Sequence, residues 1–449
     1  MDSRQLQFAI DACGGQPHGI DPHINFQRVC TDTRKLKSGD LFLALRGKNC
    51  DGNQFASSAI AAGAVAVVVD AVCDAPSLVV PDTRRALGQL AAAYRAEMEA
   101  TVFGIAGSNG KTSTKEMLAA ILRAQMETLH SEASFNNDIG VPTTLLALEP
   151  HHRAAVLELG TNHPGELAPL VNMAAPQFGL LTGIGREHLE FFKTLEGVAR
   201  EEGVLGELLP RGGKLFLYGD DEWSHSIAQR SNAPVITVGF GEANDWRVDG
   251  VEVAENGTLF EVRAPSAEWS GRYTTPLLGR HQAANATLAI AAAAELGLNV
   301  ETIARGLAEC PAPAMRLQLS KKNGVRWLND AYNANADSVK AALETLASLE
   351  VKGKRYAVLG DMAELGDHAV SAHREAGEQA AVTLDGLIAV GELAAITATA
   401  AIEAGLAKAE AVADVNEAAS MLRDWLQSGD AVLLKASRAA RLEQIEDLI

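Results

Sequence analysis

Short apolar runs alternate with longer segments of helical periodicity along most of the chain. Each run has the composition of a buried strand and contains or precedes glycine or a turn residue; the runs cover residues 101–107, 154–160, 178–185, 214–220 and 233–240. After the first run, apolar residues at helical spacing predict a helix that includes Met117, Leu118, Ile121 and Leu122. This alternation predicts an α/β protein with a doubly wound, mostly parallel sheet.

Residues 245–273 follow a different pattern, in which apolar and polar positions alternate with a period of two. Asn256 and Gly257 form a dipeptide that is typical of tight hairpin turns. We therefore expect a small antiparallel patch at the edge of the central sheet. An Ala-rich segment, residues 281–298, then returns to the helical pattern.

Residues 188–205 have the pattern of an acidic surface helix. Apolar side chains recur near helical spacing at Leu189, Phe192, Leu195, Val198 and Leu205, and glutamates fill the positions between them. The plain interpretation of this pattern is a solvated face without a chemical role.

The chain divides into three blocks, residues 1–99, 100–313 and 314–449. Pro311 and Pro313 mark the second boundary, and strand-like and helical segments alternate again beyond it. A length of 449 residues also exceeds what one hydrophobic core usually organises. We therefore predict three domains with these bounds.

Charge and composition exclude several classes of protein. The net charge of −18 argues against a nucleic-acid partner or binding to an anionic membrane. The five cysteines are scattered without CxxC spacing, which favours neither a zinc site nor a disulfide framework. The N-terminus lacks the pattern of a signal peptide, and the longest apolar run, residues 59–69, is too short to span a bilayer. We expect a soluble, cytoplasmic protein without membrane insertion.

The segment "GIAGSNGKTSTKEM" carries the clearest chemical signal. A strand enters a glycine-rich turn, and Lys-Thr opens the following helix, which is the arrangement of a phosphate-binding loop. The strict P-loop pattern requires glycine at the position of Ile105, so this loop is a shorter variant. The predicted nucleotide contacts are Gly107, Ser108, Asn109, Gly110, Lys111, Thr112 and Ser113. Such a loop alone leaves kinase, GTPase, ATPase and ligase open.

Two further polar residues lie just beyond predicted strands. Glu158 ends one strand, and His188 follows the next. Sites of open α/β sheets collect at such strand ends, so these residues, together with Thr112, can complete a Mg²⁺ site beside ATP. A glutamate at a strand end is by itself more typical of a cap or an ion pair, but both residues together behind a phosphate loop favour the metal site.

Seven ordered motifs, together with the segment "TDTRKLKSGDLFLAL" that begins at Thr31, resemble the Mur ligase family and extend to Arg438. They are "GSNGKTSTKEML", "SFNNDIGVPTTLL", "LELGTNHPGEL", "LLGRHQAANATLAI", "NDAYNANADSVKAAL", "LGDMAELG" and "KASR". The resemblance implies a UDP-sugar-binding N-terminal domain, a central ATP-binding domain and a C-terminal Rossmann-like domain that closes over the active site. The motifs favour the family member that joins D-alanyl-D-alanine to UDP-MurNAc-tripeptide in peptidoglycan precursor synthesis. We expect a monomer, as for most of the family.

The resemblance also implies a reaction and roles for individual residues. ATP phosphorylates the tripeptide carboxylate, and the dipeptide amine then displaces phosphate from the acyl phosphate. Lys111 holds phosphate, and Thr112, Glu158 and His188 support Mg²⁺. Further nucleotide contacts are implied for Asn285, Arg316, Asp330 and Asn333. Substrate contacts are implied for Thr33, Arg34, Asn136, Lys435, Ser437 and Arg438, and a catalytic position beside the γ-phosphate for Asn137.

One departure from the family pattern has chemical content. After the histidine, the family commonly carries a lysine that CO₂ carbamylates, and its carbamate places an anion beside Mg²⁺. Glu202 occupies that position here. We predict that Glu202 supplies this carboxylate directly and so acts as a catalytic and metal-binding residue; the alternative is a solvated surface acid. Milder departures are Ala336 where the family usually has proline, Ala436 where glycine is usual, and Gln282 where asparagine is common.

Four alternatives stay open at this point. Two of them belong to the same superfamily: the ligase that adds the third peptide residue and a folylpolyglutamate synthase. The first calls for an amino-acid-recognition motif that is not found in the third block, and the second usually lacks the first block. A P-loop kinase or GTPase leaves the third block without a role. A non-catalytic paralogue is opposed by the presence of Lys111, Glu158 and His188.

Overall fold

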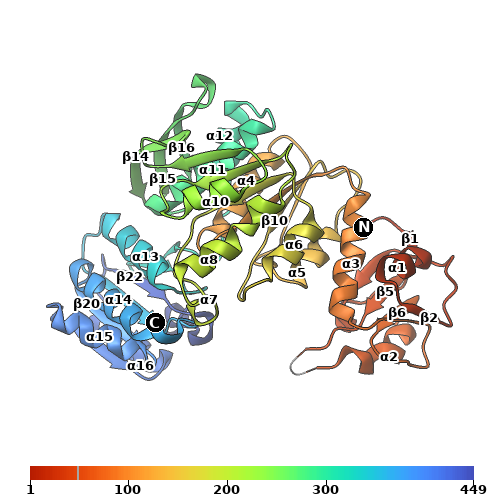
Figure 1. The fold of residues 1–449 in the computed structure, drawn as a ribbon. Helices are drawn as coiled ribbons and strands as arrows, with labels where there is room; N and C mark the ends of the chain where they lie inside the picture. The colour runs from red at the N-terminus through yellow and green to blue at the C-terminus, as the bar shows by residue number, and fades with distance from the viewer. Residues whose placement is uncertain (48–49) are drawn as a thin grey trace. The chain divides into compact units, whose positions relative to one another are not determined.

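The computed structural model describes residues 1–47 and 50–449 as a mixed α/β protein (Figure 1). Over these residues the strands form four sheets, of two, five, nine and six strands. Backbone contacts divide the chain into two compact units. The first comprises residues 1–104, 126–161 and 166–178, and the second comprises residues 105–125, 162–165 and 179–449. The predicted α/β class is confirmed.

The first unit begins with two small sheets. Strands β1 (Arg4–Gln5) and β3 (Asn25–Phe26) pair antiparallel, and helix α1 (Leu6–Cys13) lies between them in the sequence. The five-stranded sheet has the order β2 (Gln16–His18), β7 (Ser77–Val79), β6 (Ala66–Val69), β5 (Asp40–Leu43) and β4 (Arg28–Cys30). Helix α2 (Ala56–Ala61) packs Ala59 into an apolar core with Val67 and Val69. Asp82 begins helix α3 (Thr83–Ala96) by accepting hydrogen bonds from the backbone N–H groups of Arg84 and Arg85.

The nine-stranded sheet combines parallel and antiparallel strands. Its order is β16 (Gly271–Thr275), β15 (Gly257–Arg263), β14 (Trp246–Ala254), β13 (Val235–Gly239), β12 (Lys214–Tyr218), β11 (Phe178–Leu181), β8 (Thr101–Ala106), β10 (Ala154–Glu158) and β9 (Thr128–His130). β14, β15 and β16 form the predicted antiparallel patch. Ala254 pairs with Gly257, so the hairpin turn is Glu255–Asn256, one residue earlier than predicted.

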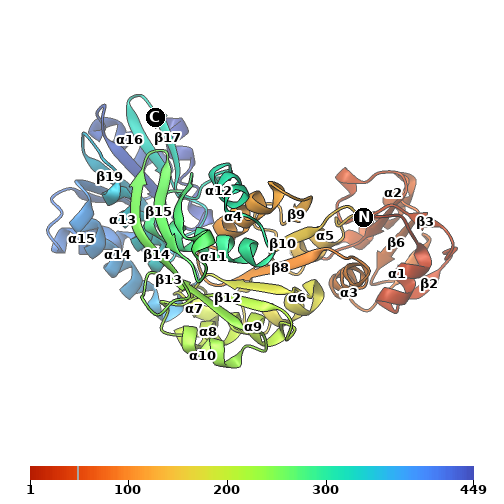
Figure 2. The same ribbon diagram turned by 90° about the horizontal axis from the view of Figure 1, so that it is seen from above.

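Helices alternate with the strands of this sheet along the chain. They are α4 (Lys111–Arg123), α5 (Gly140–Leu145), α6 (Leu167–Ala174), α10 (Ser224–Arg230), α11 (Arg280–Glu295) and α12 (Val300–Ala308). The apolar stripe predicted for α4 is fully buried. α11 lies beside α4 (Figure 2), and its many alanines let the two helices pack closely. Within the described residues, no helix is both long and apolar enough to cross a membrane.

The predicted acidic helix is broken into three short helices. α7 (Leu189–Phe192), α8 (Leu195–Glu202) and α9 (Val204–Leu208) replace the expected continuous segment. Lys193 has a positive φ of 67°, which ends α7, and the Thr194 hydroxyl accepts the backbone N–H of Gly197 to begin α8. Glu201 and Glu202 are buried at the end of α8. The interpretation of this segment as a solvated face is therefore wrong at Glu201 and Glu202, whereas Glu190 and Glu196 are exposed.

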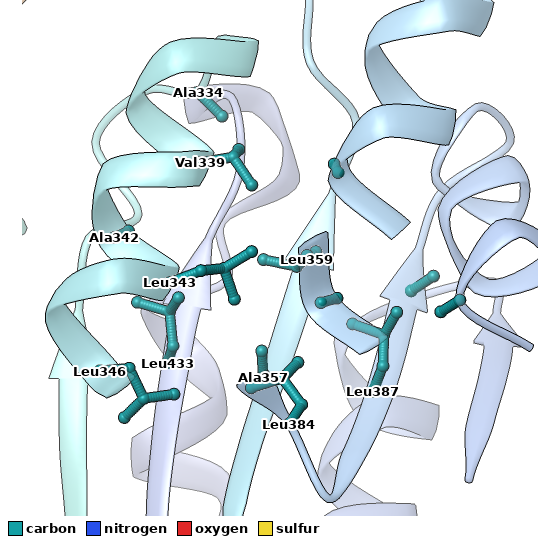
Figure 3. Packing of buried hydrophobic residues seen from close by; sticks show 14 of the residues in the cluster. Ala334, Val339, Ala342, Leu343, Leu346, Ala357, Leu359, Leu384, Leu387 and Leu433 are labelled. Atoms are coloured by element: carbon teal, nitrogen blue, oxygen red, sulfur yellow. The ribbon is translucent and has the colours of Figure 1, made fainter. Parts of the chain in front are cut away.

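The C-terminal part of the second unit contains the six-stranded sheet. Its order is β17 (Gln318–Lys322), β18 (Val325–Asn329), β22 (Ala431–Lys435), β19 (Arg355–Gly360), β20 (Gly386–Val390) and β21 (Ala409–Val412), and only β17 is antiparallel to its neighbour. The helices are α13 (Ala336–Ser348), α14 (Ala369–Thr383), α15 (Ala394–Glu403), α16 (Val415–Trp425) and α17 (Gln444–Leu448). Leu343 and Leu346 of α13 pack against Leu433 of β22 and Ala357 of β19 (Figure 3).

Candidate functional site

The glycine-rich loop connects β8 to the first turn of α4, as the sequence predicts. Gly107 has a φ of 113°, and a Cβ atom there would lie 2.6 Å from the Thr182 hydroxyl. Gly110 has a φ of 90°, and a Cβ atom there would lie 2.6 Å from Oδ1 of Asn285. Both the backbone conformation and the close neighbours therefore require glycine. The loop leads into a helix N-terminus, which is a favourable environment for an anion.

Lys111 folds back over the phosphate loop. Its ammonium group donates hydrogen bonds to the backbone carbonyls of Gly107 and Ser108, the second at 3.2 Å. It also lies 3.5 Å from a carboxylate oxygen of Glu187. This position keeps a cation at the mouth of the loop, where the predicted phosphate would bind.

Glu202 contacts the phosphate loop directly. Its Oε2 accepts a hydrogen bond of 2.7 Å from the backbone N–H of Gly107, and the residue is 1% exposed. Burial raises the pKa of Glu202, and the nearby Lys111 ammonium opposes that rise. The structure thus excludes the alternative in which Glu202 is a solvated surface acid. Glu201 instead accepts the backbone N–H of Gly165 at 2.8 Å.

Glu187 is a buried acid that was not predicted from the sequence. Burial raises its pKa to about 8, against the opposing effect of Lys111 and with a further rise from Glu202. Oε1 of Glu187 and Oε1 of Glu202 are both buried without a hydrogen bond from another residue type in the described part of the chain, and the two acids are close enough for one to hydrogen-bond the other once it is protonated. The position of Glu187 directly before His188 is the signal that would have indicated it. Two carboxylates therefore lie beside the lysine of the phosphate loop.

His188 lies in the loop after β11 and has a positive φ of 49°. Its Nδ1 is hydrogen-bonded to the carboxylate of Glu364, from the loop after β19. Burial lowers the pKa of His188, and Glu364 partly offsets this effect. Glu364 was not predicted, because 176 residues separate it from the histidine.

In the first unit, Asn136 and Glu158 come together. Nδ2 of Asn136 donates to Oε1 of Glu158 at 3.0 Å, at the end of β10. The side chain of Asn137 points elsewhere and accepts the backbone N–H groups of Ile139 and Gly140, which begin α5. The catalytic role of Asn137 stays a prediction.

Thr33 and Arg34 lie in a short 3₁₀ helix of the first unit, Thr33–Lys35. The Arg34 guanidinium is highly exposed and pairs with Asp32 at 2.8 Å. Hydrogen bonding from the Arg34 guanidinium lowers the pKa of Asp32 to about 2. Both predicted substrate residues are therefore close to solvent, in the segment between β4 and β5.

A cavity of about 750 Å³ in the second unit gathers most of the predicted nucleotide contacts. The predicted residues that line it are Asn109, Gly110, Ser113, Asn285, Arg316, Asp330 and Lys435. Phe240 and Arg280 were not predicted, and the Arg280 guanidinium lies 3.9 Å from the centre of the Phe240 ring. Asn285 donates to Gln282 at 3.2 Å within α11. The cavity combines aromatic, cationic and amide groups, as a nucleotide site requires.

A buried ion pair lies at this cavity. The Lys435 ammonium donates to Asp330 at 2.5 Å and to the backbone carbonyl of Asn333 at 3.0 Å. Burial lowers the pKa of Lys435, and Asp330 offsets part of this effect. Arg316 stacks on the ring of Tyr332 at 4.2 Å. The family resemblance implied a substrate contact for Lys435, whereas here Lys435 lines the same cavity as the predicted nucleotide residues.

Ser437 and Arg438 are not among the residues that line the cavity. The Ser437 hydroxyl accepts the backbone N–H of Ala363 at 2.8 Å. Arg438 pairs with Glu443 at 2.6 Å near the C-terminus. Their roles in substrate binding stay predictions.

Three family models match the chain. The Mur ligase family catalytic domain matches residues 25–95, the Mur ligase middle domain residues 105–293, and the Mur ligase glutamate ligase domain residues 315–438. A curated relative from Escherichia coli (strain K12) is 38% identical over 99% of this chain and 98% of its own length. The chain belongs to the Mur ligase family. That relative is named UDP-N-acetylmuramoyl-tripeptide–D-alanyl-D-alanine ligase.

Solved structures of Mur ligases agree with this assignment. MurF from Acinetobacter baumannii has a TM-score of 0.92 and 32% identity, over 100% of this chain and 99% of that one. MurF ligase from Thermotoga maritima, solved in complex with ADP, has a TM-score of 0.85 and 27% identity, over 94% and 96% of the two chains. The resemblance inferred from the sequence motifs is therefore confirmed, and with it the ligase class and the use of ATP.

Proposed function

We propose that this Mur ligase joins D-alanyl-D-alanine to the terminal carboxylate of UDP-N-acetylmuramoyl-tripeptide in peptidoglycan synthesis. The observation that carries the proposal is the 38% identity to a relative with that name, over nearly the full length of both chains. The phosphate loop supports it, because Lys111 lies 3.5 Å from Glu187 and the Gly107 N–H donates to Glu202. The chain would act in the cytoplasm, because UDP-N-acetylmuramoyl-tripeptide and D-alanyl-D-alanine are both water-soluble. It would act as a monomer, as expected for most of the family.

Three domains would divide the binding of the substrates. Residues 1–99 would hold the UDP-sugar, with Thr33 and Arg34 near the uridine or the diphosphate. Residues 100–313 would bind ATP, and residues 314–449 would close over the active site. The cavity lined by Asn285 and Arg316 is large enough for the nucleoside part of ATP.

The phosphate loop would neutralise charge during the first step. A carboxylate is a poor electrophile, so its oxygen attacks the γ-phosphorus of ATP, and ADP leaves. Lys111 would turn from the carbonyl groups of its own loop to the transferred phosphate, where its charge stabilises the transition state. Backbone N–H groups of the loop would hold the phosphates in line with the attacking carboxylate.

The amine of D-alanyl-D-alanine would then attack the acyl carbon, and the C–O bond to phosphate would break. The amine loses a proton and phosphate carries away the electron pair, so the products are the amide and inorganic phosphate. An acyl phosphate is rapidly lost to water, and exclusion of water is a physical reason for closure by the third domain. Asn136 and Asn137 would position the tripeptide carboxylate.

The residues beside the loop fit a magnesium ion that is shared with the nucleotide. No cluster of three or more His, Cys, Asp or Glu residues with metal-site geometry occurs in residues 1–47 and 50–449. Mg²⁺ is commonly held by one or two carboxylates plus substrate phosphates, and Glu202 has a buried oxygen without a hydrogen-bond donor. Thr112, Glu158, His188 and Glu202 are the proposed ligands. When bound, the ion would neutralise charge on the phosphates.

Glu202 would provide the anion that relatives obtain by carbamylating a lysine. The carboxylate reaches the loop because α8 ends against it, so the shorter side chain needs no added CO₂. One of its oxygens binds the Gly107 N–H, which leaves the other for the ion. This arrangement predicts a ligase whose activity does not depend on bicarbonate.

The test is an assay of the purified chain with ATP, Mg²⁺ and UDP-MurNAc-tripeptide. We expect phosphate release that requires D-alanyl-D-alanine, and a product whose mass corresponds to the pentapeptide. A matched reaction with L-alanyl-L-alanine controls for non-specific hydrolysis of ATP. Absence of turnover that depends on the D-dipeptide would refute the proposal.

A further inference from the structure

Arg186 binds two carboxylates from separate helices of the C-terminal segment. It lies in the loop after β11, two residues before His188. Its guanidinium donates to Asp337 of α13 through Nε at 2.9 Å and Nη2 at 2.6 Å. It also donates to Glu375 of α14 through Nη1 at 2.5 Å and Nη2 at 3.1 Å. The backbone N–H of Arg186 donates a fifth hydrogen bond, of 2.7 Å, to Asp337.

The same helix is also tied to the phosphate loop. Asn335, which caps the N-terminus of α13, donates through Nδ2 to Oδ1 of Asn109 at 3.0 Å. The side chain of Asp337 approaches Gly185 so closely that a Cβ atom there would lie 2.9 Å from Oδ2. Arg186 and Asn109 therefore fix the first turn of α13 against the two loops that carry the proposed phosphate and metal ligands.

We infer that Arg186 is a positioning residue, which holds α13 and α14 against the phosphate loop during both steps of the reaction. The inference rests on the proposed function for its reaction, although the contacts themselves do not. Arg186 would contact neither ATP nor the acyl group. It acts by keeping the cavity wall formed by Asp337, Ser338 and Ala341 next to Asn109 and Gly110.

The charges explain why this residue would have a large effect. Asp337 and Glu375 both lie within hydrogen-bonding distance of one guanidinium, and all three side chains are about one-third exposed. The two carboxylates repel each other, and Arg186 is the group that makes their proximity favourable. Hydrogen bonding to both acids raises the pKa of Arg186 further, so the guanidinium stays charged. Without it, repulsion would favour an open arrangement of the same segments.

The residue that follows Arg186 connects these ion pairs to the proposed phosphate site. Glu187 follows Arg186 directly and lies 3.5 Å from the Lys111 ammonium. One short segment thus has Arg186 bound to the C-terminal helices and Glu187 directed toward the phosphate loop. A shift of this segment would move Glu187 and His188 relative to Lys111, and a displacement of about 1 Å can reduce a rate by about a hundredfold.

The experiment compares Arg186→Met with Arg374→Met in the full chain. Arg374 precedes Glu375 on α14 but pairs with Glu403 on α15, so its loss removes an ion pair without touching the loop. We expect Arg186→Met to lower kcat/KM about ten- to a hundredfold, with most of the change in KM for ATP, and to release more phosphate per amide formed. Arg374→Met should leave these values unchanged.

A double variant separates positioning from loss of folding. In Arg186→Met with Glu375→Gln, the repulsion between the acids is removed, so we expect recovery of at least a third of the lost kcat/KM. Hydrogen exchange of residues 184–190 and 335–340 supplies a readout that needs no turnover. With ADP present, exchange in both segments should rise about tenfold in Arg186→Met and fall again in the double variant.

The outcomes distinguish this inference from the proposed function. Unchanged kinetics and unchanged exchange in Arg186→Met would overturn it, as would equal effects of Arg374→Met. Faster exchange that the double variant reverses would support the contact even if the wild-type chain formed no amide. In that case the proposed reaction would fail while Arg186 still held the segments together.

Discussion

Replacement of Glu202 by glutamine isolates the charge of the carboxylate from its structural contact. Glutamine has the same length, and its carbonyl oxygen can accept the 2.7 Å hydrogen bond from Gly107 that Glu202 accepts. The phosphate loop should therefore keep its conformation. Only the negative charge beside Lys111 and the proposed Mg²⁺ is lost.

The expected magnitudes follow from that geometry. Because the acceptor remains, the free energy of unfolding should change by less than about 1 kcal/mol. Glu202→Leu would instead leave the Gly107 N–H without its acceptor, at a cost of about 1–3 kcal/mol. Loss of a preorganised charge at the site of phosphate transfer should lower kcat about 10²–10³-fold, or about 2.7–4 kcal/mol in the activation free energy.

The assay measures phosphate release at limiting and at saturating Mg²⁺, with and without bicarbonate. Wild type should respond to Mg²⁺ but not to bicarbonate. Glu202→Gln should lose activity most strongly at limiting Mg²⁺, and Glu202→Lys should regain part of it when bicarbonate is added. If Glu202→Gln keeps full activity at limiting Mg²⁺, the carboxylate has no role in metal binding and the reasoning fails.

Three further predictions concern the cavity and the core. Gly110→Ala should weaken ADP binding at least tenfold by titration calorimetry, since its Cβ atom would lie 2.6 Å from Asn285 at a φ of 90°; an unchanged Kd would contradict this. Leu346→Ala should lower the free energy of unfolding, measured by urea denaturation, by about 2–5 kcal/mol, because this side chain of α13 is fully buried in the core. A change below about 1 kcal/mol would show that the core rearranges to fill the cavity. Burial lowers the pKa of His281 to about 4, so the unfolded chain takes up a proton near pH 6.5 that the folded chain does not. Stability should therefore fall as pH drops from 6.5 to 4, by up to about 1.4 kcal/mol per unit, and His281→Asn should remove that part of the dependence; parallel curves for the two proteins would refute it.

Local patterns predicted the elements that depend on neighbouring residues. The helix α4 and the strand before it follow from the apolar stripe and the glycine turn, and the antiparallel patch follows from period-two alternation. The acidic segment was predicted incorrectly, because helical spacing alone cannot distinguish a solvated face from one that ends against a loop. The burial of Glu201 and Glu202 depends on contacts with Gly165 and Gly107, which lie 36 and 95 residues away in the sequence.

The sequence by itself determined the class of fold, the phosphate loop and the family, since each depends on ordered residues whose spacing has a local physical meaning. Only the tertiary structure decided which acids approach that loop. Glu187 lies 76 residues beyond Lys111, with Glu202 further on, and Glu364 and Asp337 reach their partners from the other side of residue 314. Ionic and hydrogen-bonding interactions act over a few ångströms in space, so sequence separation carries no information about them until the chain folds. The single departure at Glu202 could be located from the sequence, but its contact with Gly107 required the fold.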